Sequence, residues 1–182
     1  MKTEYEAKFL DIDINEMRKK LSSLGAECVH SERMMHRVVF ESEYLQNRRA
    51  WLRVRNEGDV TKLTLKAASD ATDITRIKEV EVSVADFKAT VDLLIGLGLE
   101  QKRYQENKRE SWRLGDISIE LDSWPNIPPY IEIEAGSEEE VRSVSENLNF
   151  DYESAVFGSA DEVYKNHYGI DILKMDRLIF EE

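Results

Sequence analysis

The feature that most constrains this sequence is an alternation of apolar and charged residues in six separate segments. In residues 50–56, for example, Leu52 and Val54 alternate with Arg53 and Arg55. A two-residue period is that of a β-strand with one apolar and one charged face. The segments with this pattern are residues 4–9, 50–56, 60–67, 78–83, 115–122 and 130–135. Two further candidates, residues 34–42 and 107–114, bring the expected number of strands to about eight.

Helical patterns separate these strands. Asp13, Ser83 and Ser137 are the expected N-caps, and Gly25 and Gly98 stand where two of the helices should end. A strand with a Glu-x-Glu motif followed by a helix occurs three times, and neither element can bury its apolar face alone. The sequence therefore predicts an α+β fold in which helices cover one sheet. The expected helices span residues 14–24, 85–97, 138–147 and 160–169.

Length and composition set further limits. The 182 residues contain no Gly, Pro or Ser-rich linker, so we expect a single domain over residues 1–182. The net charge of -12 disfavours nucleic acid and anionic lipid as partners, and no apolar run approaches the roughly 20 residues that span a bilayer. The lone Cys28 excludes an internal disulfide. We expect a cytoplasmic protein, and we leave a homodimer open.

The direction of the charged faces decides the function class. In ordinary antiparallel sheets such faces point to water. Here, however, acidic pairs and basic pairs are sorted onto different strands, whereas a solvated surface mixes the two signs. About eight strands can also close into a barrel that holds side chains or one small ligand. We therefore expect a closed eight-stranded antiparallel barrel, or tunnel, with a charged interior and with helices packed on its outside.

The charged residues point to a particular chemistry. Crowded carboxylates in a partly desolvated site take up a proton or a cation, and an all-oxygen donor set suits Mg²⁺ or Mn²⁺. Basic side chains, above all guanidinium groups, suit phosphate oxygens. A divalent cation beside such bases indicates a polyphosphate ligand. The acids are Glu4, Glu6, Asp122, Glu132 and Glu134, and the bases are Lys8, Arg53, Arg55, Lys66 and Arg109.

The order of these residues resembles the CYTH superfamily of triphosphate tunnel metalloenzymes. The resemblance rests on Glu4-x-Glu6-x-Lys8, on LRVR with Arg53 and Arg55, and on LTLK with Lys66, and it covers nearly the whole chain. It continues with EVE at Glu79 and Glu81, the strand around Arg109, LD at Asp122, and EIE at Glu132 and Glu134. The resemblance implies a tunnel that binds a small-molecule triphosphate and uses a divalent cation to break a phosphoanhydride bond.

Residue by residue, the resemblance implies that Glu4, Glu132 and Glu134 bind the metal, with Glu6 close enough to share an ion or to orient water. Glu6, Lys8 and Lys66 would act at the reacting phosphate. The phosphate clamp would comprise Lys8, Arg53, Arg55, Lys66 and Arg109, with Glu79 and Glu81 beside it and Asp122 available to a metal. Two positions depart from the family pattern: Asn107 stands where many members have a base, and Lys165 is the one candidate for a C-terminal basic residue.

Three functions remain compatible with these residues. Hydrolysis is favoured, because a cyclase must also bind adenine and the sequence shows no clear stacking pocket. Trp51 and Trp112 are read as packing residues. Trp124 lies in a Pro-containing loop, where it could cover the tunnel mouth, although a plain hairpin connection is favoured. The alternative is a class IV adenylyl cyclase that makes cyclic AMP and pyrophosphate from ATP. A second alternative is a module that binds triphosphate or polyphosphate without turning it over.

Overall fold

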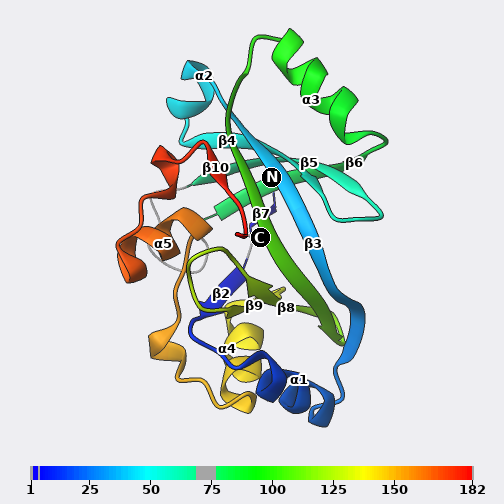
Figure 1. The fold of residues 1–182 in the computed structure, drawn as a ribbon. Coiled ribbons are helices and arrows are strands. Elements are labelled where there is room, and N and C mark those ends of the chain that lie inside the picture. Colours follow the sequence, from blue (N-terminus) through cyan, green and yellow to red (C-terminus); the bar gives the residue numbers. More distant parts are fainter. Residues whose placement is uncertain (1, 4, 69–76, 182) are drawn as a thin grey trace.

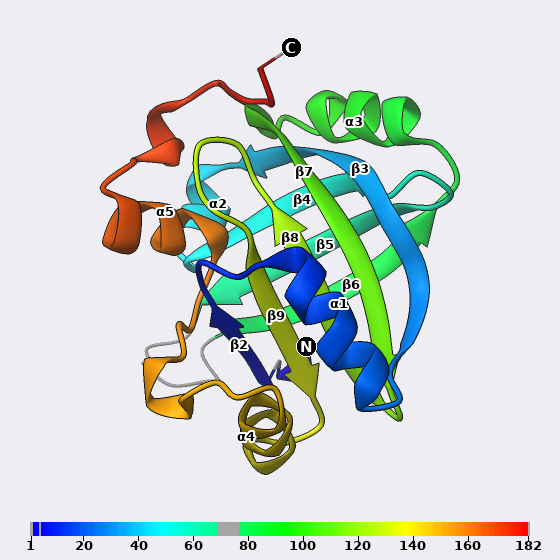
Figure 2. The same ribbon diagram turned by 60° about the horizontal axis from the view of Figure 1, so that its bottom comes forward.

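A curled antiparallel sheet forms the centre of the structure. The computed structural model describes residues 2–3, 5–68 and 77–181 (Figure 1). The strand order is β1-β6-β5-β4-β3-β7-β8-β9-β2, and β10 pairs with β7 in parallel. Seen from below, the strands bend into a half-barrel (Figure 2). The strands are β1 (Lys2–Thr3), β2 (Tyr5–Phe9), β3 (Glu27–Glu41), β4 (Ala50–Asn56), β5 (Thr61–Ala68), β6 (Ile77–Val84), β7 (Glu100–Leu114), β8 (Ile117–Ser123), β9 (Tyr130–Ala135) and β10 (Arg177–Leu178).

The N-terminal segment contributes to both ends of this strand order. β1 pairs with β6 through Lys2 opposite Glu79, and β2 pairs with β9 through Tyr5 opposite Ala135. Glu4 lies between the two pieces and outside the described residues. The two ends of the order are therefore consecutive pieces of one segment.

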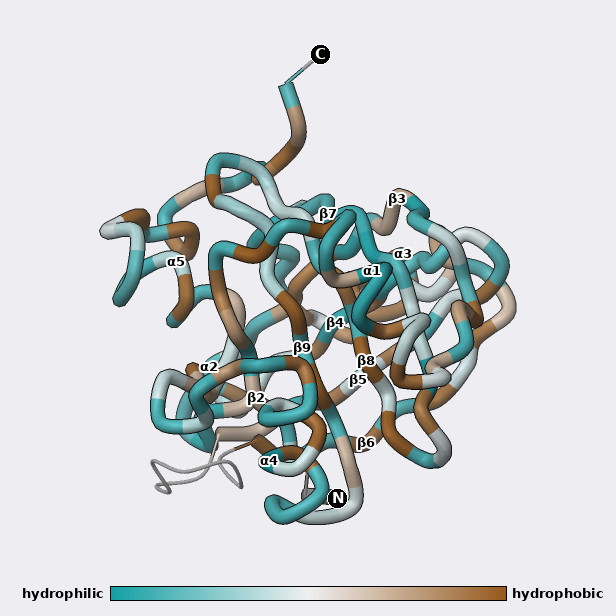
Figure 3. Tube along the Cα trace, turned by 90° about the horizontal axis from the view of Figure 1, so that it is seen from below, coloured by the Kyte–Doolittle hydropathy of each residue, from teal (hydrophilic) through white to brown (hydrophobic). Residues whose placement is uncertain are grey.

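The α+β class and the eight predicted strands are confirmed. β3 and β7 are longer than predicted, at 15 residues each, and they pair with each other over most of their length. Their pairing has register shifts, for example between Val39 and Phe40, so a simple two-residue period did not extend along them. Figure 3 shows how hydrophilic and hydrophobic positions alternate along the chain.

Helices cover much of the apolar face of the sheet, but Val80 and Val82 of β6 are exposed. α1 and α4 pack on β2, β8 and β9, where Leu21, Ile131, Ile133 and Leu148 are fully buried. Each such side chain contributes about 1.5–3 kcal/mol by leaving water. α3 packs on β3 and β4 through Leu94, and Tyr164 of α5 belongs to the same buried cluster as Leu178 of β10 (Figure 1). The helices are α1 (Ile14–Ser23), α2 (Glu43–Gln46), α3 (Phe87–Gly96), α4 (Glu138–Asn147) and α5 (Ala160–Tyr168), with 3₁₀ turns η1 (Tyr152–Ser154) and η2 (Ile172–Lys174).

The helix boundaries follow local capping. Asp13 and Ser137 cap α1 and α4 as predicted. The predicted cap of α3 at Ser83 is wrong: Ser83 pairs with Lys62 inside β6, and the side chain of Asp86 accepts the hydrogen bond from the Ala89 N–H at 2.6 Å. The strand thus continues past the expected cap, and α3 begins at Phe87. None of the helices in the described ranges is long and apolar enough to cross a membrane.

Candidate functional site

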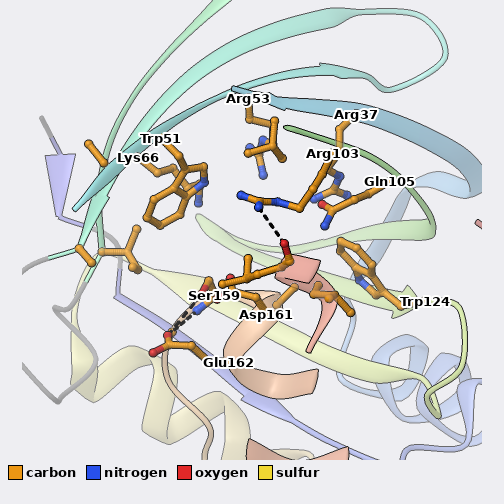
Figure 4. Close-up of a pocket in the computed structure, with 18 of the residues that line it drawn as sticks. Arg37, Trp51, Arg53, Lys66, Arg103, Gln105, Trp124, Ser159, Asp161 and Glu162 are labelled. Carbon is orange, nitrogen blue, oxygen red and sulfur yellow. Dashed lines mark hydrogen bonds between the residues drawn. The ribbon is translucent and has the colours of Figure 1, made fainter. Parts of the chain in front are cut away.

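A pocket of about 420 Å³ lies against the concave side of the sheet, which is a volume typical of small-ligand sites. β2, β3, β4, β5, β7 and β9 supply side chains to it, and residues 158–162 and 172–173 cover one end. Figure 4 shows Lys66 and Trp51 on one side, Arg53 above, and Arg37, Gln105 and Trp124 on the other side. The predicted site residues that line this pocket are Glu6, Lys8, Arg53, Lys66, Arg109 and Glu132.

A dense cluster of acids and bases joins β2, β7, β8 and β9. Lys8 lies opposite Glu132 in the β2–β9 pairing, and its Nζ contacts Glu6 and lies 3.3 Å from Glu132. Arg109 lies opposite Asp122, contacts it, and reaches Glu132 at 2.5 Å. Asp122 is fully buried. The alternation of each strand places these side chains on the same face, so they meet although they are distant in the sequence.

The electrostatics of this cluster centre on Glu6. Burial and the neighbouring Glu132 carboxylate together raise the pKa of Glu6 to about 8. Although burial opposes ionisation of Glu132, Lys8 and Arg109 hold the pKa of Glu132 well below its usual range. Burial favours neutral Lys8, but the carboxylates of Glu132 and Glu6 outweigh it and raise the pKa of Lys8. Because the two carboxylates titrate together, these shifts mean that the Glu6–Glu132 pair shares one proton near neutral pH.

A second cluster joins β4, β5 and β6. Lys62 lies 2.9 Å from Glu81, and the Thr64 hydroxyl donates to Glu81 at 2.8 Å. Arg53 lies 3.6 Å from Glu81. Burial alone would raise the pKa of Glu81, but the contacts with Lys62 and Thr64 lower it to about 2. Burial and the adjacent Arg55 lower the pKa of Arg53 to about 10.

Several predicted residues lie outside the lining of the main pocket. Arg55 lines a neighbouring pocket of about 190 Å³ that shares Arg109 with the first. Glu79 contacts Lys66 at 3.3 Å from the adjacent strand, and Glu81 supports Arg53 in the same way. Glu134 lies opposite Glu6 in the β2–β9 pairing. Lys165 is exposed on α5 and does not line the pocket, and Glu4 lies outside the described residues.

The structure also brings to the pocket residues that the sequence did not assign to the site. Trp124 lies in the connection between β8 and β9, as predicted, but it is also buried, lines the pocket and packs with Tyr164 of α5. Trp51 lines the pocket as well, whereas Trp112 is a packing residue of the core under α1, as predicted. Arg37 of β3 is buried and lines the pocket. Because Arg37 is followed by Val38 and Val39, the sequence around it does not alternate between charged and apolar residues, and no such pattern marked Arg37 as a site residue.

The predicted metal ligands fit a divalent cation in their chemistry. Glu6 and Glu132 are joined by a hydrogen bond, and a cation can replace the proton that such a pair holds. In the described ranges, however, no group of three or more acid, histidine or cysteine side chains is arranged to hold a metal ion. A complete ligand set would have to include Glu4 or waters. Oxygen ligands of this type suit Mg²⁺ and Mn²⁺.

Fold and site together define an α+β protein whose curled antiparallel sheet presents acids and bases to one pocket. The chain belongs to the CYTH domain family, which its sequence matches over residues 2–162. Members of this family are enzymes, triphosphatases and adenylyl cyclases among them, that bind triphosphates and use divalent metal ions. The search of curated proteins found no match.

Solved structures share the fold at low sequence identity. A conserved hypothetical protein of Pyrococcus furiosus is 23% identical with a TM-score of 0.72, covering 87% of this chain and 98% of its own. A candidate adenylate cyclase of Vibrio parahaemolyticus is 12% identical with a TM-score of 0.77, covering 90% and 98%. HpAC1 from Hippeastrum, described with a dominant triphosphatase activity, is 16% identical with a TM-score of 0.61, covering 94% and 99%. At these identities the likeness shows the fold alone.

Proposed function

We propose that this protein is a metal-dependent hydrolase that cleaves a phosphoanhydride bond of inorganic triphosphate or an organic triphosphate. The observation that carries the proposal is the convergence of Lys8, Arg53, Lys66 and Arg109 on one pocket, beside the Glu6–Glu132 pair. Four cations around a cavity suit the several negative charges of a phosphate chain. A carboxylate pair that holds a proton in place of a cation suits the metal such a substrate needs.

We further propose that the sheet closes into a tunnel with a charged interior. The pairing of β1 with β6 and of β2 with β9 supports closure, because one N-terminal segment then joins both ends of the strand order. Closure removes the open edges of the sheet. It would also exclude water from the basic walls, which strengthens their attraction for phosphate.

The basic residues of the site would bind the phosphate chain, and the acidic residues would bind the metal ion. Lys8, Arg53, Lys66 and Arg109 would hold the phosphate chain in line, with Arg55 at the inner end and with Glu79 and Glu81 fixing Lys66 and Arg53. Glu132, with Glu4, Glu6, Asp122 and Glu134, would hold Mg²⁺ or Mn²⁺, and the ion would supply charge neutralisation on the phosphate oxygens. Glu6 is also placed to accept a hydrogen bond from an attacking water.

Adenylyl cyclase activity is the second candidate, and one observation favours it. Trp51 and several apolar residues line the same pocket as the bases, among them Ala50 and Ala68. An aromatic ring beside a phosphate site can stack on a nucleobase. Hydrolysis remains the preferred function, because the charged side chains around the pocket account for triphosphate binding whether or not the triphosphate carries a nucleobase.

The test is orthophosphate release from inorganic triphosphate with Mg²⁺ or Mn²⁺, measured beside cyclic AMP formation from ATP. We expect release by the wild type and a loss of about 100-fold or more in Glu132→Gln. Glu139→Gln is the matched control, because Glu139 is exposed on α4 and away from the pocket. Cyclic AMP formation without triphosphate hydrolysis would establish the cyclase. Metal-dependent binding without either product would indicate a binding module.

A further inference from the structure

Arg37 differs from the other bases around the pocket in its surroundings. It is 6% exposed and projects from the middle of β3, between Arg55 of β4 and Gln105 of β7 in the strand pairing. It lines the pocket from the side that also carries Gln105 and Trp124 (Figure 4). A buried guanidinium on a pocket wall needs partners for its N–H groups.

The five bases of the predicted phosphate clamp all contact carboxylates. Lys8 contacts Glu6, Arg53 and Lys66 contact acids of β6, Arg55 contacts Glu57, and Arg109 contacts Asp122. Among the described residues, no carboxylate forms such an ion pair with Arg37, and its Nε has no hydrogen-bond partner. Among the bases of this site, Arg37 is therefore the buried one that forms no ion pair with an acid in the part of the chain that the structure describes.

The partners that Arg37 does have hold it in place without neutralising it. One Nη2 N–H donates to the Asn107 side-chain oxygen, and the guanidinium carbon lies 4.5 Å from the centre of the Trp124 ring. The Asn107 amide in turn donates to Asp122 at 2.9 Å, which fixes the orientation of the amide. Stacking on an aromatic face orients an arginine and leaves its edge free for an anion.

The neighbours of Arg37 make an anion favourable there. Burial, together with repulsion from Arg53, Arg55 and Arg109, holds the pKa of Arg37 well below its usual range. Such repulsion is relieved when a multiply charged anion enters. Asn107 occupies the inward position two residues before Arg109 on β7, where a neutral amide cannot supply charge. Arg37, one strand away and bonded to that amide, supplies it instead.

We propose, resting on the triphosphate-binding function above, that Arg37 is a further phosphate-binding residue, which Trp124 and Asn107 hold toward the pocket. Its guanidinium contacts non-bridging oxygens of the phosphate chain from the β3 side. The cation on this wall of the pocket thus comes from β3.

The experiment measures binding of inorganic triphosphate in the presence of Mg²⁺ by calorimetry, beside thermal unfolding of the ligand-free protein. We expect Arg37→Gln to weaken binding about 10- to 100-fold. The ligand-free variant should unfold at the same or a higher temperature, because a repelled charge has been removed. The control Arg142→Gln removes another arginine stacked on an aromatic ring, Tyr152, but Arg142 does not line the pocket, and binding should not change.

The double variant Arg37→Gln with Asn107→Lys separates charge from structure. Because it returns a cation to the same wall, we expect it to recover at least about 5-fold of the lost affinity. Weaker binding together with a lower unfolding temperature and no recovery would overturn the proposal in favour of a packing role. Wild-type affinity in Arg37→Gln would overturn it and leave the triphosphate function intact. No binding by the wild type would overturn both.

Discussion

The proton held between Glu6 and Glu132 predicts that metal binding depends on pH. Two half-buried carboxylates that both contact Lys8 share one proton, and the pKa of Glu6 is raised to about 8. A divalent cation that binds both groups must displace this proton, so affinity should increase as the pH rises. Because the raised pKa belongs to an acid, the proton is bound below about pH 8 and is lost above it.

The magnitude follows from that pKa. About half of the Glu6 carboxyl groups are ionised at pH 8.0 and about one thirtieth at pH 6.5, so the affinity for Mn²⁺ should be about 16-fold weaker at the lower pH. At pH 7.0 the binding of one ion should release about 0.9 proton. An ordinary glutamate with a pKa near 4.5 would release almost none over this range.

Calorimetric titration with Mn²⁺ in two buffers of different ionisation enthalpy counts the released protons. The wild type and the control Glu139→Gln should behave alike. Glu6→Gln should show little proton release and a nearly flat pH dependence from 6.5 to 8.0, because the titrating group is gone. Binding by the wild type without proton release at pH 7.0 would refute the reasoning about the carboxylate pair.

Three other substitutions test how the site is supported. Arg109→Gln leaves Asp122 and Glu132 without their shared cation and should cost about 3–5 kcal/mol of unfolding free energy. Without Arg109, the Asp122 and Glu132 carboxyls of the folded variant should hold protons that the same groups in the unfolded chain release as the pH rises. The loss of unfolding free energy should therefore be larger at pH 8 than at pH 5.5, and equal losses in urea unfolding at the two pH values would contradict this. Tyr164→Phe removes the hydrogen bond to the Pro125 carbonyl at 2.5 Å and should cost about 1 kcal/mol in the same assay, and no loss would mean that this bond does not hold α5. Ile133→Ala empties a fully buried position under α4 and should cost about 2–5 kcal/mol, whereas a loss below 1 kcal/mol would mean that the core closes over the gap.

The sequence predicted the strands and much of the site because both depend on a short period. Successive side chains of a strand point to opposite faces, so Arg53 and Arg55 share one face of β4 and Leu52 and Val54 share the other. Residues 52–55 alone are enough to predict this. Capping was less certain, because Ser83 and Asp86 are both good N-caps and the choice depends on how far β6 pairs with β5. Local sequence does not contain that information.

Residues whose roles depend on distant partners could not be predicted. Arg37 lies between His36 and Val38, and the role proposed for it depends on its contacts with Asn107 and Trp124 on other elements. Trp124 occupies a Pro-containing loop for which a hairpin connection was favoured over a cover for the tunnel mouth, and in the structure it shares a buried cluster with Tyr164 of α5 and Ile172 of η2. Tertiary packing decides such positions, and a single sequence with two-residue patterns does not record it.

The split pairing of the N-terminal segment has a consequence for biosynthesis. Tyr5 is synthesised about 130 residues before its strand partner Ala135. Lys8 therefore cannot lie against Glu132 until β9 has emerged, while β3, β4 and β5 can already pair as successive hairpin neighbours. β2 must therefore wait, unpaired on its β9 side, and the acid–base site can be assembled only after β9 has been synthesised.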